Sequence, residues 1–452
     1  MLKVHFIAIG GSAMHNLAIA LHHKGYLVTG SDDEIFDPSK GRLAKYGLLP
    51  EKIGWNTAKI DIELDAVIVG MHAREDNVEL NKAQDLGLKI FSYPEFIYEQ
   101  TKNKKRVVIG GSHGKTSITS MILHVLQYHE LDADYLVGAQ LSGFDCMVRL
   151  SDSASIAIIE GDEYLSSPID RRPKFHLYQP DIALLSGIAW DHINVFPTFS
   201  NYVEQFDTFI DKITVDGALI YFDGDEEVVG VAERARKEIR KYTYGTHDHF
   251  IEDGVTCLKT DVGDVRIAVF GDHNLQNLNG AKLVCRELGL SEDQFYVAIA
   301  TFQGASKRLE LVKRTNNAVM YKDFAHSPSK LKATTNALKQ QYPKRELIAC
   351  MELHTFSSLN KEFLTQYNGA MIAADRALVY FDPKVLIHKK LSPLSKEDVM
   401  EAFATANVEV YIESETIIDE LRKLSWKGKN LLMMSSGNFN GVNFGELADE
   451  LM

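Results

Sequence analysis

The stretch from Arg106 to Ile122 reads RVVIGGSHGKTSITSMI, and the rest of the chain is organised around it. Val107 to Ile109 is a short β-branched run typical of a buried strand, glycines end it, and a helical pattern runs from Ile118 to Val125. A strand, a glycine loop and a helix in that order form a phosphate cradle, because backbone N–H groups in the loop and at the helix N-terminus point at the anion.

The side chains of this loop predict an ATP site with Mg²⁺. Lys115 can reach the β- and γ-phosphate oxygens, and the Thr116 hydroxyl can ligate the metal. Ile109 stands where the usual consensus has its first glycine, so the loop is a compact variant. The alternative is an ordinary glycine turn before a lysine, and the agreement of strand, loop and helix argues against it. The expected ATP-binding residues of the loop are Gly111, Ser112, His113, Gly114, Lys115, Thr116 and Ser117.

The composition indicates a globular protein of about three domains. The chain has 452 residues, 45% hydrophobic and 25% charged, with a net charge of -13. This acidic balance argues against nonspecific nucleic-acid binding but not against a local basic site for an anionic substrate. Cysteines are scattered, and the start lacks the pattern of a signal peptide. No apolar run is long enough to cross a bilayer. We therefore expect a cytoplasmic protein with unpaired thiols.

The first domain begins with a βαβ pattern. Lys3 to Ile9 predicts a strand and Met14 to His23 a helix. Tyr26 to Thr29 predicts a second strand, which leads to Asp32. The positions of the dinucleotide glycine fingerprint are held by Ala8, Gly10 and Ala13. With one glycine kept, we favour a phosphate-bearing ligand other than NAD at this helix N-terminus over plain packing.

Two further strands complete this domain. Ala66 to Gly70 predicts a strand that puts Met71 and His72 at its carboxyl end, which is the ligand side of an open α/β sheet. Ile90 to Pro94 predicts the last short strand. The charged stretch from Thr101 to Arg106 reads as a solvated linker at a domain boundary rather than a nucleic-acid contact.

Two strands of the second domain end near polar groups. Ile156 to Ile159 is followed by Glu160, and Ile182 to Leu185 leads to His192. Carboxyl ends of parallel strands meet at one edge of a sheet, beside the phosphate loop, so both side chains are candidate Mg²⁺ ligands. The alternatives are a helix-capping acid for Glu160 and a surface loop histidine for His192.

A helix predicted to begin within Gly271 to Asn277 carries two amides. Val265 to Phe270 predicts the strand before it, and Asp272 can cap the helix. Asn274 and Asn277 lie on one face of the first turn, where amides can read the edge of a base. Local capping by these amides is an equally good interpretation of the spacing.

The third region, from about Thr301, again alternates strands and helices. Val319 to Asp323 predicts a strand followed by His326. Four more strands are predicted at 347–351, 377–381, 408–411 and 430–434, and the last leads into Ser435 to Asn438. The predicted fold class is therefore α/β with three domains: Rossmann-like at the N-terminus, a central P-loop ATPase-type domain and a Rossmann-like C-terminal domain.

The order of these motifs resembles the Mur ligase family, which builds the peptidoglycan precursor. GGSHGKTS resembles the ATP loop of the family, EGDEY its magnesium acid and WDHINVF its magnesium histidine motif. GDHNLQN resembles its adenine-binding motif HN-x-x-N, and KRLEL with KDFAHSPSK resembles its C-terminal arginine and D-[FY]-x-H-x-P motif. IGGSAM with GSDD resembles the UDP-sugar domain of members that accept UDP-N-acetylmuramate.

The resemblance implies an ATP-dependent ligase of cell-wall synthesis that uses ATP and Mg²⁺. Residues 1–100 are expected to bind the UDP-sugar, 101–303 to bind ATP, and 304–452 to bind the incoming amino acid or peptide. Neither nucleic acid nor a membrane is an expected partner, and the chain is expected to be a monomer or a homodimer. Phosphorylation of a carboxylate by ATP would give an acyl phosphate, which an amine then attacks to form an amide.

The resemblance also implies roles for individual residues. The UDP-muramate site would comprise Gly10, Gly11, Ser12, Ala13, Met14, Asp32, Met71 and His72. Asn274 would read adenine, and Arg308 and Asp323 would reach the γ-phosphate and ribose. His326 and Ser436 would face the incoming peptide. The metal ligands would be Thr116, Glu160 and His192, and the catalytic set Lys115, Glu160, His192, Arg308 and His326.

Two branches of the family fit, one adding L-alanine and one the tripeptide L-alanyl-γ-D-glutamyl-meso-diaminopimelate to UDP-N-acetylmuramate. EGDEYLSSPIDRRPKFHLYQP and MMSSGNFNG are similar to the tripeptide branch, which recycles murein peptides. Ser327 and Lys322 depart from its pattern, and 352–357 lacks the arginine of either branch. A P-loop binding module or transport ATPase would leave Glu160 and His192 without a use, and an NAD-dependent oxidoreductase would leave the phosphate loop unused.

Overall fold

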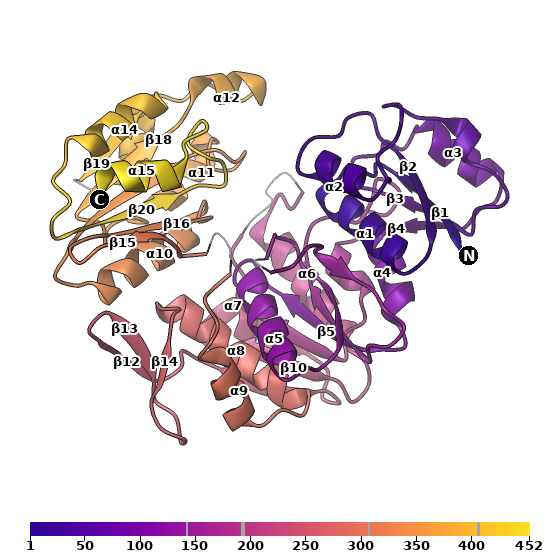
Figure 1. Cartoon of the computed structure of the whole chain (residues 1–452), viewed down its shortest axis with the longest axis horizontal. Helices are drawn as coiled ribbons and strands as arrows, with labels where there is room; N and C mark the ends of the chain where they lie inside the picture. The colour runs from indigo at the N-terminus through magenta and orange to yellow at the C-terminus, as the bar shows by residue number, and fades with distance from the viewer. Residues whose placement is uncertain (142, 191–194, 306–307, 405–406) are drawn as a thin grey trace. The chain divides into compact units, whose positions relative to one another are not determined.

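The strand that precedes the glycine loop lies in the middle of the largest sheet of the computed structural model (Figure 1). The order of this sheet is β11-β10-β9-β5-β8-β6-β7, and its strands are parallel except for β7. The central strand β5 spans Lys105–Gly110, between β8 (Ile156–Glu160) and β9 (Ile182–Leu185). The carboxyl ends of these strands therefore lie side by side, as predicted.

The structure describes residues 1–141, 143–190, 195–305, 308–404 and 407–452. These residues form two compact units. The first comprises 1–190, 195–245 and 280–295, and the second 246–279 and 296–452 within the described residues. Among the described residues, no helix combines the length and the apolar character needed to cross a bilayer.

The N-terminal part of the first unit is a four-stranded parallel sheet with helices on both faces. Its strands, in the order β2-β1-β3-β4, are β1 (Lys3–Ile7), β2 (Leu27–Ser31), β3 (Ala66–Val69) and β4 (Ile90–Ser92). Its helices are α1 (Ser12–His23), α2 (Ser39–Lys45), the 3-10 turn η1 (Thr57–Lys59), α3 (Val78–Asp85) and α4 (Tyr93–Thr101). Buried residues of α1 join one core cluster that continues into the central sheet.

The central part of the first unit surrounds β5. Its other strands are β6 (Ala133–Leu136), β7 (Val148–Arg149), β10 (Ala218–Phe222) and β11 (Arg240–Tyr244). Its helices are α5 (Lys115–Tyr128), the 3-10 turn η2 (Lys174–Leu177), α6 (Phe199–Asp211) and α7 (Glu226–Arg234). Two helices, α8 (Asp272–Glu287) and α9 (Glu292–Ile299), have residues in both units.

The second unit contains two sheets. A three-stranded antiparallel sheet comprises β12 (His249–Glu252), β13 (Val255–Leu258) and β14 (Val265–Ile267). A six-stranded sheet has the order β15-β16-β20-β17-β18-β19, with β15 (Glu310–Arg314), β16 (Val319–Asp323), β17 (Glu346–Glu352), β18 (Arg376–Tyr380), β19 (Val408–Tyr411) and β20 (Lys429–Met434). It is parallel except for β15 at the edge.

Helices cover both faces of the six-stranded sheet (Figure 1). They are α10 (Pro328–Gln341), α11 (Lys361–Leu364), η3 (Thr365–Tyr367), α12 (Pro383–His388), α13 (Lys396–Phe403), α14 (Ser414–Arg422) and α15 (Phe444–Leu451). Alternate residues of β17 enter different cores: Ala349 packs with residues of α10, whereas Cys350 packs with residues of α14. A strand buried on both faces reads as a continuous apolar run, which explains why the sequence revealed it.

The predicted α/β fold is confirmed, and the differences are local. The strand expected over 265–270 ends at Ile267. Strands β6, β7, β11, β12, β13 and β15 were not predicted, because they are short, polar or at sheet edges. The cysteines are free and buried, as expected.

A pair of glycine substitutions tests this packing. Gly30 pairs with Phe6 across β1 and β2, and a Cβ there would lie 2.5 Å from the Ile9 side chain. Gly30→Ala is expected to lower the free energy of unfolding by about 1–3 kcal/mol through overpacking. Gly230 lies inside α7, where a Cβ would meet nothing nearer than Arg234 at 3.4 Å. Gly230→Ala is expected to stabilise by about 0.5–1 kcal/mol. Urea unfolding measures both, and equal effects would contradict the packing.

Candidate active site

The turn after β5 requires glycine at Gly111. This residue has φ +129°, and a Cβ built there would lie 2.3 Å from Ser186 Oγ and 3.1 Å from the Ser186 amide nitrogen. Gly114 has φ +83° and precedes the first residue of α5. The backbone therefore passes close to the end of β9 before it enters the helix, which is the shape that a phosphate cradle requires.

The Lys115 ammonium points back into this turn. Its Nζ donates to the Gly111 carbonyl oxygen at 2.5 Å and to a Glu163 carboxylate oxygen at 2.6 Å. Its side chain is 14% exposed and that of Glu163 is 2% exposed. Burial lowers the pKa of Lys115, but the negative charges of Glu163 and Asp162 raise it by more, so the net shift is upward. The loop therefore holds a fixed positive charge.

Thr116 and Glu160 bring oxygen atoms together at the edge of the sheet. The Thr116 hydroxyl donates to Glu160 Oε1 at 2.9 Å, and the Gly138 amide donates to Glu160 Oε2 at 2.9 Å. A hydroxyl and a carboxylate are the hard oxygen ligands that Mg²⁺ prefers, and they lie beside Lys115. The Thr116 hydroxyl and the Glu160 carboxylate are therefore suited to hold Mg²⁺ together with the phosphates of ATP. The capping alternative for Glu160 does not apply, since it receives a loop amide and a side-chain hydroxyl.

His192 lies outside the described residues. Among the described residues, no three histidine, cysteine or acidic side chains converge as metal ligands.

The other residues of the phosphate loop are close to β9. Ser186 Oγ donates to the His113 carbonyl oxygen, and a Cβ at Gly187 would lie 2.1 Å from the His113 ring. Ser117 is buried in the first turn of α5.

Sequence reasoning missed Glu163 and the aromatic residue that supports it. The Tyr202 hydroxyl donates to Glu163 Oε1 at 3.1 Å and lies 2.9 Å from Ser112 Oγ. The Ala189 amide in turn donates to Ser112 Oγ at 2.8 Å. The signal was present, because Glu163 belongs to the same EGDEY motif as Glu160. No local sequence pattern indicates a functional role for Tyr202, which lies within α6.

The predicted sugar-nucleotide residues gather at the carboxyl ends of β1 and β3. The Gly10 amide donates to Asp32 Oδ2 at 2.6 Å, and a Cβ at Gly10 would lie 2.9 Å from that oxygen. Asp32 is buried, which raises the pKa of its carboxyl. Asp32 therefore holds the loop that contains Gly10 and Gly11 in place. Ala8, which precedes this loop, has φ +68°.

The remaining residues of this set are at the start of α1 and after β3. Ser12 and Ala13 are exposed in the first turn of α1. Met14 is buried against Gly70, where a Cβ would lie 3.1 Å from Met14 Cγ. After β3, Met71 is half-buried and His72 exposed. Exposed backbone at a helix N-terminus is suited to a phosphate group.

In the second unit, Asp323 organises the end of β16. It accepts the amides of Leu309 and Ala325 at 2.6 Å each. Burial raises the pKa of Asp323, and the Arg308 guanidinium lowers it by less. Arg308 itself stacks 5.1 Å from the centre of the Phe324 ring. The predicted pair is therefore together, and Asp323 shapes the turn in addition to any contact with a ligand.

Other predicted residues of this unit have local partners, with one exception. His326 Nδ1 lies 2.7 Å from the Phe324 carbonyl oxygen. Asn274 Nδ2 donates to the Phe270 carbonyl oxygen at 2.9 Å, a local contact with the segment before α8 rather than a cap of the helix N–H groups. The Ser436 hydroxyl is buried without a hydrogen-bond partner. Such an atom is costly to bury, and a bound group can supply the missing partner.

Of the two single-residue departures from the family pattern, Lys322 has a local explanation. Lys322 forms an ion pair with Glu310 at 2.8 Å, across the antiparallel pair of β15 and β16. Ser327 immediately precedes α10 but makes no side-chain cap. Lys322 is therefore used within the sheet edge, and nothing in the structure explains Ser327.

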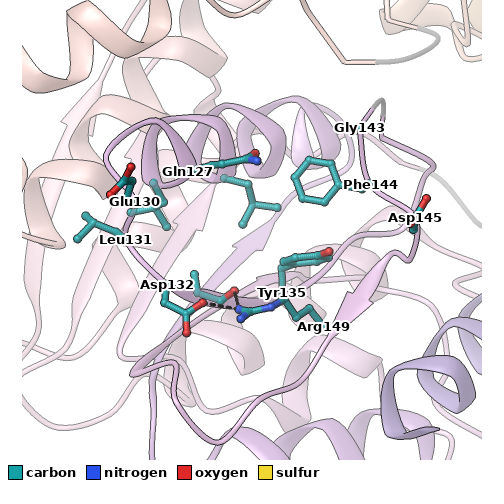
Figure 2. A pocket seen from close by; sticks show the side chains of 12 residues that line it. Gln127, Glu130, Leu131, Asp132, Tyr135, Gly143, Phe144, Asp145 and Arg149 are labelled. Atoms are coloured by element: carbon teal, nitrogen blue, oxygen red, sulfur yellow. Dashed lines mark hydrogen bonds and ion pairs between the residues drawn. The ribbon is translucent and has the colours of Figure 1, made fainter. Parts of the chain in front are cut away.

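A separate pocket of about 420 Å³ lies at the other end of α5 (Figure 2). Tyr135 of β6 and Phe144 form an aromatic wall with ring centres 5.2 Å apart. Arg149 on β7 forms an ion pair with Asp132 at 2.7 Å (Figure 2). The pocket contains none of the predicted site residues.

Comparisons with known proteins agree with this geometry. The model of the Mur ligase family, catalytic domain, matches residues 3–105, that of the Mur ligase middle domain matches 109–285, and that of the Mur ligase, glutamate ligase domain, matches 307–437. A UDP-N-acetylmuramate--L-alanine ligase of Caldicellulosiruptor saccharolyticus is 30% identical over 458 residues, which cover 97% of either chain.

Two solved structures share the fold. The murein peptide ligase of Psychrobacter arcticus has a TM-score of 0.64 and 23% identity, covering 100% of this chain and 99% of that one. The UDP-N-acetylmuramate-alanine ligase of Thermotoga maritima has a TM-score of 0.70 and 17% identity, covering 100% and 98%.

Mur ligases form amide bonds with ATP and Mg²⁺ and act on UDP-N-acetylmuramate-based substrates with an amino acid or a peptide. The matched models include the glycine loop, Glu160 at the end of β8 and the six-stranded sheet of the second unit. The chain belongs to the Mur ligase family and is an ATP-dependent ligase of peptidoglycan synthesis.

Proposed function

We propose that the chain joins the tripeptide L-alanyl-γ-D-glutamyl-meso-diaminopimelate to the lactoyl carboxylate of UDP-N-acetylmuramate, through an acyl phosphate, in peptidoglycan recycling. The proposed division of work assigns the UDP-sugar to residues 1–100, ATP to 101–303 and the peptide to 304–452. The observation that carries the proposal is the segment from Asp162 to Lys174, which holds the pattern of the tripeptide branch and folds back beside the phosphate loop.

The fold of this segment is closed by its own hydrogen bonds. The Ser166 amide donates to the Arg172 carbonyl oxygen at 3.0 Å, and the Lys174 amide donates to the Tyr164 carbonyl oxygen at 2.9 Å. Lys174 Nζ donates to Asp162 Oδ2 at 2.5 Å. The exposed Arg171 follows the turn of this segment. The segment that holds the pattern of the tripeptide branch is therefore ordered by its own contacts.

The side chains supply positions and charge for the chemistry. A carboxylate is a poor electrophile, and phosphorylation gives it a good leaving group before the amine attacks. Lys115 would neutralise charge on the transferred phosphoryl group, while Thr116 and Glu160 would hold Mg²⁺, which shields the same oxygens when bound. We also propose that His192, together with Glu160, would hold a second Mg²⁺ ion. Arg308, Asp323, Asn274, His326 and Ser436 keep their proposed contacts with nucleotide and peptide.

The second candidate donor is L-alanine. The 30% identity with the L-alanine ligase of Caldicellulosiruptor saccharolyticus over nearly the whole chain favours it. The acceptor and the phosphoryl transfer are the same in both candidates, so the incoming amine alone distinguishes them.

A donor comparison tests the choice. With UDP-N-acetylmuramate, ATP and Mg²⁺, we expect ADP release with the tripeptide to exceed that with L-alanine by about tenfold or more in kcat/KM, because contacts to the additional residues stabilise the transition state. A coupled ADP assay measures both. The opposite order would replace the tripeptide by L-alanine as the proposed donor.

Removal of the loop cation tests the phosphate assignment. Lys115→Ala is expected to reduce kcat by about 10²-fold or more, because a preorganised charge aimed at the phosphoryl group is lost. Lys105→Ala, at the exposed start of β5, is the matched control and should retain activity. Near-normal turnover of Lys115→Ala would remove the phosphate-loop assignment.

Glu163 is proposed to hold Lys115 until phosphate arrives. Glu163→Gln leaves a buried ammonium without its counter-charge, so we expect a loss of about 3 kcal/mol in unfolding free energy. The double variant with Lys115→Met should lose less than the sum of the single effects. Urea unfolding measures this coupling. Glu99→Gln, which removes an exposed ion pair with Lys102, is the control. Additive effects would contradict a buried pair.

A further inference from the structure

Helix α1 carries two consecutive buried polar residues that the ligase chemistry does not use. His15 is 2% exposed and Asn16 is 4% exposed. They follow the loop and first turn where the sugar nucleotide is proposed to bind. Because burial of polar side chains is unfavourable unless they are hydrogen-bonded, their partners show what they hold in place.

The Asn16 side chain is hydrogen-bonded through both its nitrogen and its oxygen. Its Nδ2 donates to the Ser12 carbonyl oxygen at 2.8 Å and lies 3.2 Å from His15 Nε2. Its Oδ1 accepts the Met147 amide at 3.0 Å, while the Cys146 thiol lies nearer to the Asn16 backbone carbonyl oxygen, at 3.2 Å, than to Oδ1. The side chain therefore joins α1 to the strand edge before β7.

His15 fixes the orientation of that amide. Its Nδ1 lies 2.9 Å from the Gly11 carbonyl oxygen and 3.0 Å from Ser39 Oγ. Burial lowers the pKa of His15, the Gly11 carbonyl raises it and Arg42 lowers it, with a net fall. The neutral ring therefore donates from Nδ1 to Gly11 and accepts from Asn16 at Nε2, which connects both residues to the backbone of the proposed sugar-nucleotide loop.

The path continues from Met147 to the acid of the ATP site. The Met147 carbonyl oxygen accepts the Val137 amide at 2.9 Å. The next residue, Gly138, donates its amide to Glu160 Oε2 at 2.9 Å, and Glu160 Oε1 accepts from Thr116. Hydrogen bonds, together with the peptide bond between Val137 and Gly138, therefore connect Ser12 to Thr116.

Part of the segment between Gly138 and Met147 borders a pocket. Phe144 and Asp145 border the pocket of about 420 Å³ described above (Figure 2). Gln140 holds the described part of this segment through hydrogen bonds with the Phe144 carbonyl oxygen and with Arg42. The two ends are held in addition by the contacts with Asn16 and with Glu160.

We propose that Asn16 is a positioning residue that couples occupancy of the sugar-nucleotide loop to the placement of Glu160 for Mg²⁺ and ATP. The inference rests on the proposed function, because it takes UDP-N-acetylmuramate as the ligand of the loop at Gly10 to Ser12. Binding that shifts the Ser12 carbonyl shifts the Asn16 amide, and the hairpin transmits this to the Gly138 amide. ATP then meets a completed metal site when the acceptor is present.

Nucleotide binding with and without the acceptor tests this coupling. The dissociation constant of a non-hydrolysable ATP analogue with Mg²⁺ is measured by calorimetry, without and with saturating UDP-N-acetylmuramate. In the native sequence we expect the acceptor to tighten nucleotide binding by about fivefold or more. Asn16→Ala should reduce that factor to about one while both ligands still bind, an effect that mere loss of stability does not produce.

The matched control is another contact between the same two parts of the first unit. Lys24, which caps the C-terminus of α1, forms an ion pair with Asp152 at 2.9 Å, outside the path. Lys24→Ala should keep the native coupling factor. If Asn16→Ala does not fold, Asn16→Asp carries the test, because it keeps an acceptor for Met147 but opposes the Ser12 carbonyl with an oxygen, and it should also lose the coupling.

The outcomes separate the two proposals. Full coupling in both Asn16 variants, or a factor of one in the native sequence when both ligands bind, would overturn the role of Asn16. An equal loss in Lys24→Ala would also overturn it, since the effect would then belong to the interface in general. Failure of UDP-N-acetylmuramate to bind at all would instead overturn the proposed function on which the inference rests.

Discussion

A buried ammonium among carboxylates is the interaction on which the candidate site depends. Removing Lys115 and Glu163 from water costs several kcal/mol per ion, so the pair persists only where hydrogen bonds satisfy the remaining groups. Gly111 supplies a carbonyl oxygen to the lysine, and Tyr202 supplies a hydroxyl to the glutamate. The glycine turn, the segment after β8 and helix α6 are thereby held together.

The parallel sheet explains how distant segments supply one site. Strand β5 lies between β8 and β9, so Glu160 and Ser186 reach the same edge although 25 residues separate them and the chain passes through η2. The N-terminal sheet repeats the device on a smaller scale, with Asp32 after β2 holding the Gly10 amide after β1. In each sheet, the acidic residue follows a strand that pairs with the strand preceding the glycine loop.

The features that could be predicted from sequence are those with a local signal. The β5–α5 unit combines a β-branched run, glycines and helical spacing, and Glu160 follows a buried strand directly. Glu163 lies three residues further on, where loop geometry alone brings it to Lys115. Strand β7 has two residues and no periodicity, so the hairpin that joins Asn16 to Glu160 was invisible. Strands β12 and β15 were also missed, because they lie at sheet edges and lack a clear periodic pattern.

Satisfied and unsatisfied polar groups distinguish two kinds of role. Asn16 is buried and its amide is hydrogen-bonded to Ser12, His15 and Met147, so it acts on a substrate only through the groups that it holds. The Ser436 hydroxyl is buried without a partner, which is why we propose a contact with the peptide. Thr119 shows that this state alone is insufficient, since its hydroxyl is equally unpaired inside α5. Ser436 differs because it follows β20 at the carboxyl edge of a parallel sheet, where ligands of such sheets bind.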